Sequence, residues 1–169
     1  MNKYLVIGNP IDHSLSPLLH NFWIKKHDVD AIYEKQLIER NDIEKILNDL
    51  KDNKIQGINI TVPFKKAVIP FLDQLSETAK KTQSVNTIFK RQNKLVGDNT
   101  DVYGFSEAIK LTNFNLIDKK ALIFGAGGVV PSVILALKNM GILEITISNR
   151  TKQKADDLKK SFPFLKVIN

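Results

Sequence analysis

Short apolar runs alternate along the chain with segments in which apolar residues recur at helical spacing. The run Tyr4–Gly8 is apolar and closed by glycine, which predicts a strand buried on both faces. Apolar residues recur every three or four positions in 17–26 and 42–50, which predicts helices. Residues 57–62 are rich in β-branched side chains, which predicts a strand, and residues 32–38 are predicted to form another. This alternation of strands and helices predicts a mainly parallel sheet covered by helices.

The pattern between residues 63 and 101 predicts shorter elements. Pro63 cannot donate a ladder hydrogen bond, so the third strand should end there. A helical stretch is expected next, with apolar members Ala67, Val68, Phe71 and Leu72. Residues 76–81 are expected to form a short helix. Residues 85–90 and 95–97 are strand-like and flank Asn93-Lys94, which predicts an antiparallel hairpin.

The pattern restarts with a second α/β unit. After a predicted helix over 102–111, Ala121–Phe124 is typical of a buried strand, and the glycine-rich stretch 125–128 separates it from a helix predicted over 129–140. Further strands are predicted over Glu144–Asn149 and residues 164–169. We therefore predict an α/β chain with an N-terminal α/β sandwich over residues 1–101. Residues 102–169 are predicted to form a linking helix and the first part of a Rossmann dinucleotide-binding domain.

Composition narrows the class of protein. The 169 residues are 43% hydrophobic and 25% charged, which is ordinary for a globular protein, and no apolar run approaches the length of a membrane span. The chain contains no cysteine and passes from Met1 directly into a strand-like segment, so we expect a cytoplasmic protein without a signal peptide. His13, His20 and His27 do not cluster with carboxylates at ligand spacing, so no metal site is predicted.

The net charge of +7 favours an anionic ligand rather than a nucleic acid. Lysine supplies most of the positive charge, and it is scattered among Asp and Glu residues. The chain has no arginine-rich block and no basic run interleaved with aromatic residues that could stack on bases. We expect a small-molecule substrate, with neither a nucleic acid nor a membrane as partner.

Polar residues follow the first and third predicted strands. Ser14 and Ser16 lie in the loop after the first strand, where Ser16 is a candidate helix N-cap and the two hydroxyls could together hold a polyhydroxylated ligand. Lys65 and Lys66 follow the third strand, and ligand crevices of open α/β sheets lie beyond the carboxyl ends of their strands. A lysine on such a rigid mount can be aimed at a substrate, although paired surface lysines are usually solvated.

The second unit carries the residues expected of a nucleotide site. Glycines between a strand and a helix let the backbone approach a pyrophosphate at the helix N-terminus. Val130 occupies a position where the usual pattern has a small residue, and Pro131 fits only in the first helical turn. The next strand ends in Asn149-Arg150-Thr151 instead of the acid typical of NAD sites, which favours the 2′-phosphate of NADP.

Together these motifs resemble the shikimate dehydrogenase family along the whole chain. The motifs that carry the resemblance are Gly8-Asn9-Pro10-Ile11-Asp12-His13-Ser14-Leu15-Ser16-Pro17 with His20-Asn21, Asn59-Ile60-Thr61-Val62-Pro63-Phe64-Lys65, Ser84-Val85-Asn86-Thr87, Gly97-Asp98-Asn99-Thr100-Asp101 with Gly104, the glycine turn, and Asn149-Arg150-Thr151. The resemblance implies a cytoplasmic enzyme of the route to chorismate and the aromatic amino acids, monomeric or homodimeric. Its implied reaction is the NADP-dependent, reversible reduction of 3-dehydroshikimate to shikimate.

The resemblance also implies roles for individual residues. Lys65 and Asp101 are implied as the catalytic pair. The implied substrate-binding residues are Ser14, Ser16, Asn59, Thr61, Lys65, Asn86 and Asp101. The expected cofactor-binding residues are Gly125, Ala126, Gly127, Gly128, Val129, Asn149, Arg150, Thr151 and Lys154. The lysine and carboxylate suit the reaction, because hydride delivery to a ketone leaves an alkoxide that needs a cation and a proton nearby.

Two other readings stay open. Members of the family extend beyond the position of Asn169, so the chain is expected to lack the rest of the nucleotide-binding sheet and a C-terminal helix. It could therefore be a fragment that binds substrate without turning it over. A quinate/shikimate dehydrogenase that uses NAD is the other alternative, and Arg150 with the Ser14 and Ser16 pair argues against it.

Overall fold

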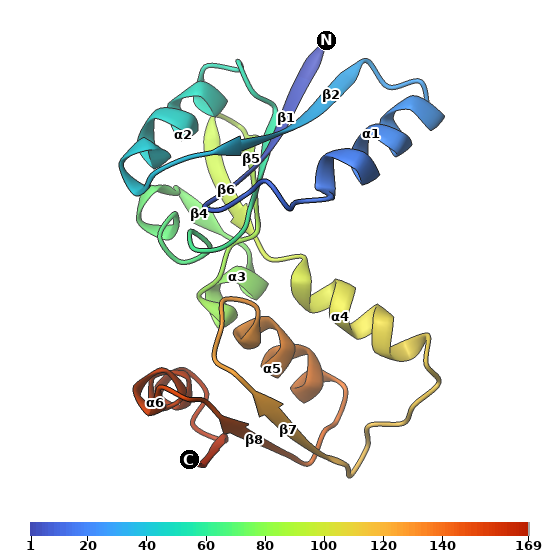
Figure 1. The fold of residues 1–169 in the computed structure, drawn as a ribbon, viewed down its shortest axis with the longest axis vertical. Helices are drawn as coiled ribbons and strands as arrows, with labels where there is room; N and C mark the ends of the chain where they lie inside the picture. The colour runs from blue at the N-terminus through green and yellow to red at the C-terminus, as the bar shows by residue number, and fades with distance from the viewer. Residues whose placement is uncertain (169) are drawn as a thin grey trace. The chain divides into compact units, whose positions relative to one another are not determined.

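Residues 1–168 are described by a computed structural model, in which the chain forms two compact units (Figure 1). The first unit comprises Met1–Lys80 and Val85–Asp98, and the second comprises Lys81–Ser84 and the chain from Asn99 onward. Each unit has its own sheet and its own hydrophobic core. Asn169, at the end of the last predicted strand, lies outside the described residues.

The first unit is built on a six-stranded sheet. Its strands are β1 (Asn2–Gly8), β2 (Ala31–Leu37), β3 (Gly57–Ile60), β4 (Gln74–Leu75), β5 (Thr87–Arg91) and β6 (Lys94–Asp98). The strand order is β2-β1-β3-β5-β6-β4. β1 pairs in parallel with β2 and β3, and β5 and β6 form the predicted antiparallel hairpin. The sheet is therefore mixed: the predicted parallel strands β2, β1 and β3 form one side of it, and the hairpin of β5 and β6 joins β3 in antiparallel pairing.

Helices cover both faces of this sheet (Figure 1). The helical segments are α1 (Ser16–Lys26), α2 (Ile43–Lys51) and α3 (Glu77–Thr82), with short 3-10 turns at Arg40–Asp42 and Ile69–Phe71. Successive side chains of a strand point to opposite faces. Leu5 and Ile7 of β1 join the core that α2 closes, whereas Val6 between them packs in a cluster with Tyr33 and with Ile24 of α1. α1 and α2 therefore lie on opposite faces of the sheet.

The second unit contains a three-stranded parallel sheet in the order β7-β8-β9. Its elements are α4 (Asp101–Lys110), β7 (Lys120–Phe124), α5 (Val130–Asn139), β8 (Glu144–Ser148), α6 (Lys152–Ser161) and β9 (Lys166–Ile168). The strand, glycine turn, helix and second strand follow one another as predicted. Val130 is buried in the core, and Pro131 lies in the first turn of α5, where its missing N–H costs no helical hydrogen bond.

Several expectations about local structure were wrong. The helical stretch expected over residues 67–72 is a series of turns ending in the 3-10 turn Ile69–Phe71, because Pro70 cannot donate the hydrogen bond that would continue a helix. β3 ends at Ile60, three residues before Pro63. α6 was not predicted at all. Thr151 stands at its N-cap position, a residue type that favours helix starts, and the residue it buries is Ala155.

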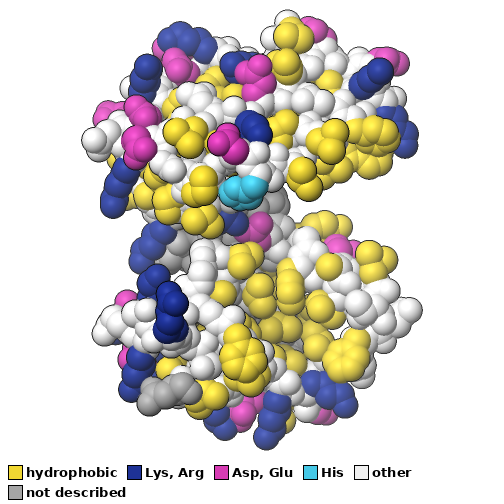
Figure 2. Space-filling model, viewed as in Figure 1, with side chains coloured by type: hydrophobic (Ala, Val, Ile, Leu, Met, Phe, Trp, Pro, Cys, Tyr) yellow, Lys and Arg dark blue, Asp and Glu magenta, His cyan; other side chains and the backbone are white. Residues whose placement is uncertain are grey.

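Apolar surface is the other difference from the predicted pattern. β7 was expected to be buried, but it is an edge strand of the described sheet, and Leu122 and Phe124 are exposed. The apolar side predicted for the first helix is also exposed: Leu18, Leu19, Phe22 and Trp23 of α1 are all accessible. Figure 2 shows hydrophobic side chains gathered on the surface of the second unit. The pattern located the apolar residues of both elements, but the prediction that β7 is buried was wrong.

Candidate functional site

The carboxyl ends of β1 and β3 are held close together in the first unit. The two strands are parallel neighbours, with Ile7 opposite Ile60. A Cβ atom added to Gly8 would lie 2.5 Å from Cγ2 of Thr61 and 3.0 Å from the carbonyl oxygen of Val62. The N–H of Asn9 donates to that carbonyl at 3.0 Å. Glycine at position 8 is therefore needed for the loops after the two strands to run side by side.

The serine loop leads from β1 into α1. Ser14 and Ser16 are both half-buried, and the hydroxyl of Ser14 accepts a hydrogen bond of 3.3 Å from the N–H of Ser16. The expectation that Ser16 is the N-cap was wrong: α1 begins at Ser16 and the residue in the cap position is Leu15, without a side-chain cap bond. The hydroxyl of Ser16 is therefore not engaged as an N-cap.

Asn59 and Asn86 meet beside the end of β3. The side-chain N–H groups of Asn59 donate to the carbonyl of Asn86 at 3.2 Å and to the hydroxyl of Thr87 at 3.0 Å. The hydroxyl of Thr87 in turn donates to the side-chain oxygen of Asn86 at 3.0 Å. On the other side, the hydroxyl of Tyr33 donates to Oδ1 of Asn59 at 2.6 Å. Two predicted ligand residues thus belong to one hydrogen-bonded cluster.

Thr61 and Lys65 lie in the turn that follows β3. Both are half-buried, and Lys66 is exposed. The turn is anchored by the buried side chains of Phe64 and Val68, and its backbone is closed by a 2.9 Å bond from the N–H of Phe64 to the carbonyl of Thr61. The carbonyl of Lys65 accepts from the N–H of Val85 at 2.8 Å. These bonds tie the lysine to the segment that carries Asn86.

Asp101 belongs to the second unit and is the first residue of α4. The side-chain oxygen of Asn99 accepts from the N–H groups of Asp101 at 3.0 Å and Val102 at 3.4 Å. Asn99 is buried, and its amide nitrogen lies 2.9 Å from the hydroxyl of Ser132 and 2.9 Å from the carbonyl of Ser84. No role was predicted for Asn99 or Ser132. The turn chemistry around Asn99 was visible, but its partners are distant along the chain.

The glycine turn lies between β7 and α5, and its shape suits a ligand that approaches the backbone. Gly125 has φ +112°, a conformation that favours glycine, and its N–H donates to the carbonyl of Ser148 at 2.8 Å. Cβ atoms added at Gly125, Gly127 and Gly128 would meet nothing within 4 Å. The N-terminal end of α5 adjoins this open backbone. These features fit the diphosphate of a dinucleotide.

The basic segment after β8 is exposed. Arg150, Thr151 and Lys154 are accessible, and the side-chain amide of half-buried Asn149 donates to the carbonyl of Thr151 at 2.7 Å. The bond shapes the loop between β8 and α6, which leaves the guanidinium and ammonium groups in solvent. A guanidinium and a hydroxyl in such a loop suit a phosphate monoester.

Metal binding and membrane insertion find no support in the described part of the chain. Within residues 1–168, no group of three or more His, Asp or Glu side chains is placed to hold a metal ion. Over the same residues, no helix has both the length and the apolar character needed to cross a membrane.

The two units together define a class of protein: an α/β unit with polar groups at its strand ends, followed by the start of a dinucleotide-binding unit. Comparison with known proteins gives the family. The model of the shikimate dehydrogenase substrate binding domain matches residues 6–88, and the model of shikimate / quinate 5-dehydrogenase matches residues 107–168.

Individual relatives agree with these matches. Shikimate dehydrogenase (NADP(+)) of Pelagibacter ubique is 58% identical over 165 residues, which are 98% of this chain and 62% of that protein. The crystal structure of shikimate dehydrogenase from Aquifex aeolicus is 40% identical and superimposes with a TM-score of 0.93, covering 100% of this chain and 63% of that one. Shikimate 5-dehydrogenase from Thermus thermophilus in complex with NADP(H) and shikimate is 32% identical, with a TM-score of 0.89, and covers 100% and 63%.

The chain belongs to the shikimate dehydrogenase family. It spans about three fifths of the length of the curated relatives it matches, with 62%, 57% and 61% of three of them covered. The resemblance stated from the motifs is confirmed, as is the α/β fold class with a Rossmann-like second part.

Proposed function

We propose that this protein acts in the NADP-linked, reversible reduction of 3-dehydroshikimate to shikimate. The observation that carries the proposal is the clustering of polar side chains at the carboxyl ends of β1 and β3 in a chain of this family. Asn59 and Asn86 share one hydrogen-bonded cluster, and Thr61 and Lys65 lie in the turn that follows β3. Such a set suits a small ligand with several hydroxyl groups, because each hydroxyl needs a polar partner.

Lys65 and Asp101 are the proposed catalytic pair. Reduction of a ketone creates an alkoxide, which an ammonium group can stabilise and protonate. In the reverse direction the same amine accepts the proton of the alcohol. The carboxylate orients the lysine and accepts a hydrogen bond from the ligand. Lys65 is mounted on a turn anchored by buried Phe64, and Asp101 is fixed at the start of α4 by Asn99.

Ser14 and Ser16 are proposed to bind the carboxylate of the substrate, and Asn59, Thr61 and Asn86 its ring hydroxyls. The half-buried serine hydroxyls stand in the loop after β1. The +7 net charge of the chain favours the approach of an anionic acid. The residues that position the substrate are therefore drawn largely from the first unit.

The second unit is proposed to hold the cofactor. The backbone of residues 125–129 would take the diphosphate, and Arg150, Thr151 and Lys154, with Asn149 shaping the loop, would take the 2′-phosphate that distinguishes NADP from NAD. When bound, the cofactor would supply the hydride in its reduced form and accept it in its oxidised form. The open space around Gly127 and Gly128 supports this assignment, since a side chain there would occupy the position of the phosphates.

The test is to mix the protein with shikimate and either NADP or NAD and to follow the absorbance of reduced nicotinamide. Reduction of NADP but not NAD is the expected result. Reduction of NAD, with quinate accepted as well, would instead support a quinate/shikimate dehydrogenase. Saturable binding of shikimate without turnover would support a substrate-binding role for these residues, and absence of both binding and turnover would refute the proposal.

A further inference from the structure

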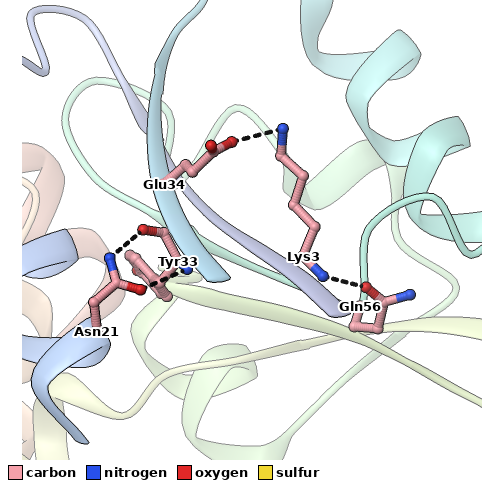
Figure 3. A network of polar contacts seen from close by, with 5 residues as sticks. All are labelled: Lys3, Asn21, Tyr33, Glu34 and Gln56. Carbon is pink, nitrogen blue, oxygen red and sulfur yellow. Dashed lines mark hydrogen bonds and ion pairs between the residues drawn. The ribbon is translucent and has the colours of Figure 1, made fainter. Parts of the chain in front are cut away.

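Tyr33 lies at the centre of a polar chain that crosses the sheet of the first unit. Its backbone is clamped by Asn21 of α1: the side-chain amide donates to the carbonyl of Tyr33 at 2.8 Å, and the N–H of Tyr33 donates to Oδ1 of Asn21 at 2.9 Å (Figure 3). The imidazole of His20 stacks on the phenol ring with 4.2 Å between centroids. The ring is 5% exposed. Its hydroxyl is therefore held in one position, 2.6 Å from Oδ1 of Asn59.

The surroundings of Asn59 leave its amide a single orientation. The carbonyl oxygen of Asn86, 3.2 Å away, can only accept a hydrogen bond, so the amide nitrogen of Asn59 must face it. The second amide hydrogen is directed to the hydroxyl of Thr87 at 3.0 Å. With the nitrogen on that side, the oxygen faces Tyr33, and the phenol must be the donor. Both amide hydrogens of Asn59 are then engaged within the protein.

A carbonyl oxygen can accept two hydrogen bonds, and Tyr33 donates one to Oδ1 of Asn59. A ligand can donate the second. We propose that Tyr33 is a positioning residue that fixes Asn59 as a hydrogen-bond acceptor toward the ligand, so that the site selects a ligand hydroxyl at this position over a keto or ether oxygen. The inference rests on the proposed function, in which Asn59 contacts a ring hydroxyl of the substrate.

The selectivity follows from elementary hydrogen bonding. A hydroxyl can donate to Oδ1 of Asn59, whereas a keto or ether oxygen offers only lone pairs, which repel it. Asn59 is half-buried, so a ligand that leaves its oxygen without a donor is expected to bind less tightly. Burial raises the pKa of Tyr33 well above its ordinary value, so the phenol is a protonated donor at neutral pH. A phenolate could not fill this role.

The first test is a double-mutant cycle on shikimate binding, measured by calorimetry. Tyr33→Phe removes the donor and is expected to weaken binding about tenfold, the usual cost of one hydrogen bond in a partly buried site. In an Asn59→Ala background the same substitution should change the affinity less than about twofold, because Tyr33 acts through Asn59. A loss of equal size in both backgrounds would show a merely structural role and overturn the inference.

Tyr4→Phe is the matched control. Tyr4 packs against the same small cluster as Tyr33 but makes no hydrogen bond to Asn59. The substitution should leave the affinity for shikimate unchanged. Unfolding curves of all variants separate loss of folding from loss of binding.

Shikimate analogues test the direction of the hydrogen bond. Each ring hydroxyl is replaced in turn by hydrogen and by fluorine, which can accept but cannot donate. At one ring position the fluoro compound is expected to bind no better than the deoxy compound, and Asn59→Ala should remove the penalty for both. Fluoro analogues that bind as tightly as shikimate at every position would overturn the inference.

A measurement on the ligand-free protein separates this inference from the proposed function. If wild-type protein does not bind shikimate, the proposed function fails. The positioning of Asn59 is still tested by NMR. Tyr33→Phe is expected to shift the side-chain amide signals of Asn59 and to speed their hydrogen exchange several-fold, and Tyr4→Phe is not. Unchanged signals in Tyr33→Phe would overturn the positioning role.

Discussion

Lys65 is the residue on which the proposed chemistry depends most directly. Lys65→Ala is expected to lower kcat by about 10²–10⁴, because a positioned proton donor contributes a factor of that order, with a smaller effect on KM. Lys66→Ala, at the exposed neighbouring position, should leave both constants within about twofold. Steady-state rates with shikimate and NADP measure both. Near-normal turnover in Lys65→Ala would remove the lysine from the mechanism.

Asp101 is expected to act together with Lys65 rather than independently of it. Asp101→Asn should also lower kcat strongly, and the double variant with Lys65→Ala should be little slower than the slower single variant, since residues that act as a unit are not additive. The same rate assay measures all three variants. Losses that multiply would show that the two residues act independently.

The free energy of unfolding is expected to depend on pH through His20. Burial lowers the pKa of His20 below its ordinary value of 6.5. Between the lowered pKa of the folded protein and 6.5, the unfolded chain binds more protons, so the free energy of unfolding rises with pH across this window. Acidification through the window should therefore destabilise the protein, and His20→Gln should flatten that part of the curve. Denaturant unfolding at a series of pH values tests this, and an unchanged slope in the variant would contradict it.

At the scale of single residues, the sequence could name candidate groups but not their hydrogen-bond partners. Asn59 and Asn86 were identified through the family motifs. Their connection through Thr87 and Tyr33 depends on the order β2-β1-β3-β5 in the sheet, which brings residues of three separate strands together. The same holds for Asn99, whose partner Ser132 is 33 positions away along the chain. Local spacing contains no signal for contacts of this kind.

At the scale of elements, the close packing of β1 on the turn after β3 can be tested with glycine substitutions. Gly8→Ala places a methyl group 2.5 Å from Cγ2 of Thr61 and is expected to destabilise the protein by about 1–3 kcal/mol. Gly104→Ala in α4 meets nothing within 4 Å and should stabilise by up to about 1 kcal/mol, because alanine favours a helix. Denaturant midpoints compare the two. Equal effects would show that space around Gly8 is not limiting.

Helices whose apolar residues recur regularly were predictable from the sequence. Segments whose structure depends on a proline or on packing against a sheet were not. α2 has its four apolar residues, Ile43, Ile46, Leu47 and Leu50, buried as the pattern predicts. The stretch near Pro70 shows apolar spacing as well, but a missing N–H outweighs periodicity there. α6 has a mostly polar surface with buried Ala155, so its apolar signal is too weak to find without the sheet it packs on.

At the scale of the whole molecule, the sequence predicted two units because the strand and helix pattern restarts near residue 102. In the described residues each unit has a core of its own. The exposure of β7 was less predictable, because a continuous apolar run looks the same in an edge strand and in a central one. Phe124 is 80% exposed.

Two cores within one chain predict that unfolding is not a single all-or-none transition. Leu50 is fully buried in the core of the first unit, and Ile134 is fully buried in that of the second. Replacing either by alanine leaves a cavity and should cost about 2–5 kcal/mol in its own unit. Leu50→Ala should therefore lower only the denaturant midpoint of the transition followed by Trp23 fluorescence, since Trp23 belongs to the first unit. Ile134→Ala should lower only the free energy of unfolding measured by amide hydrogen exchange in α5 and β8. If either variant shifted both transitions equally, the two units would unfold as one cooperative body.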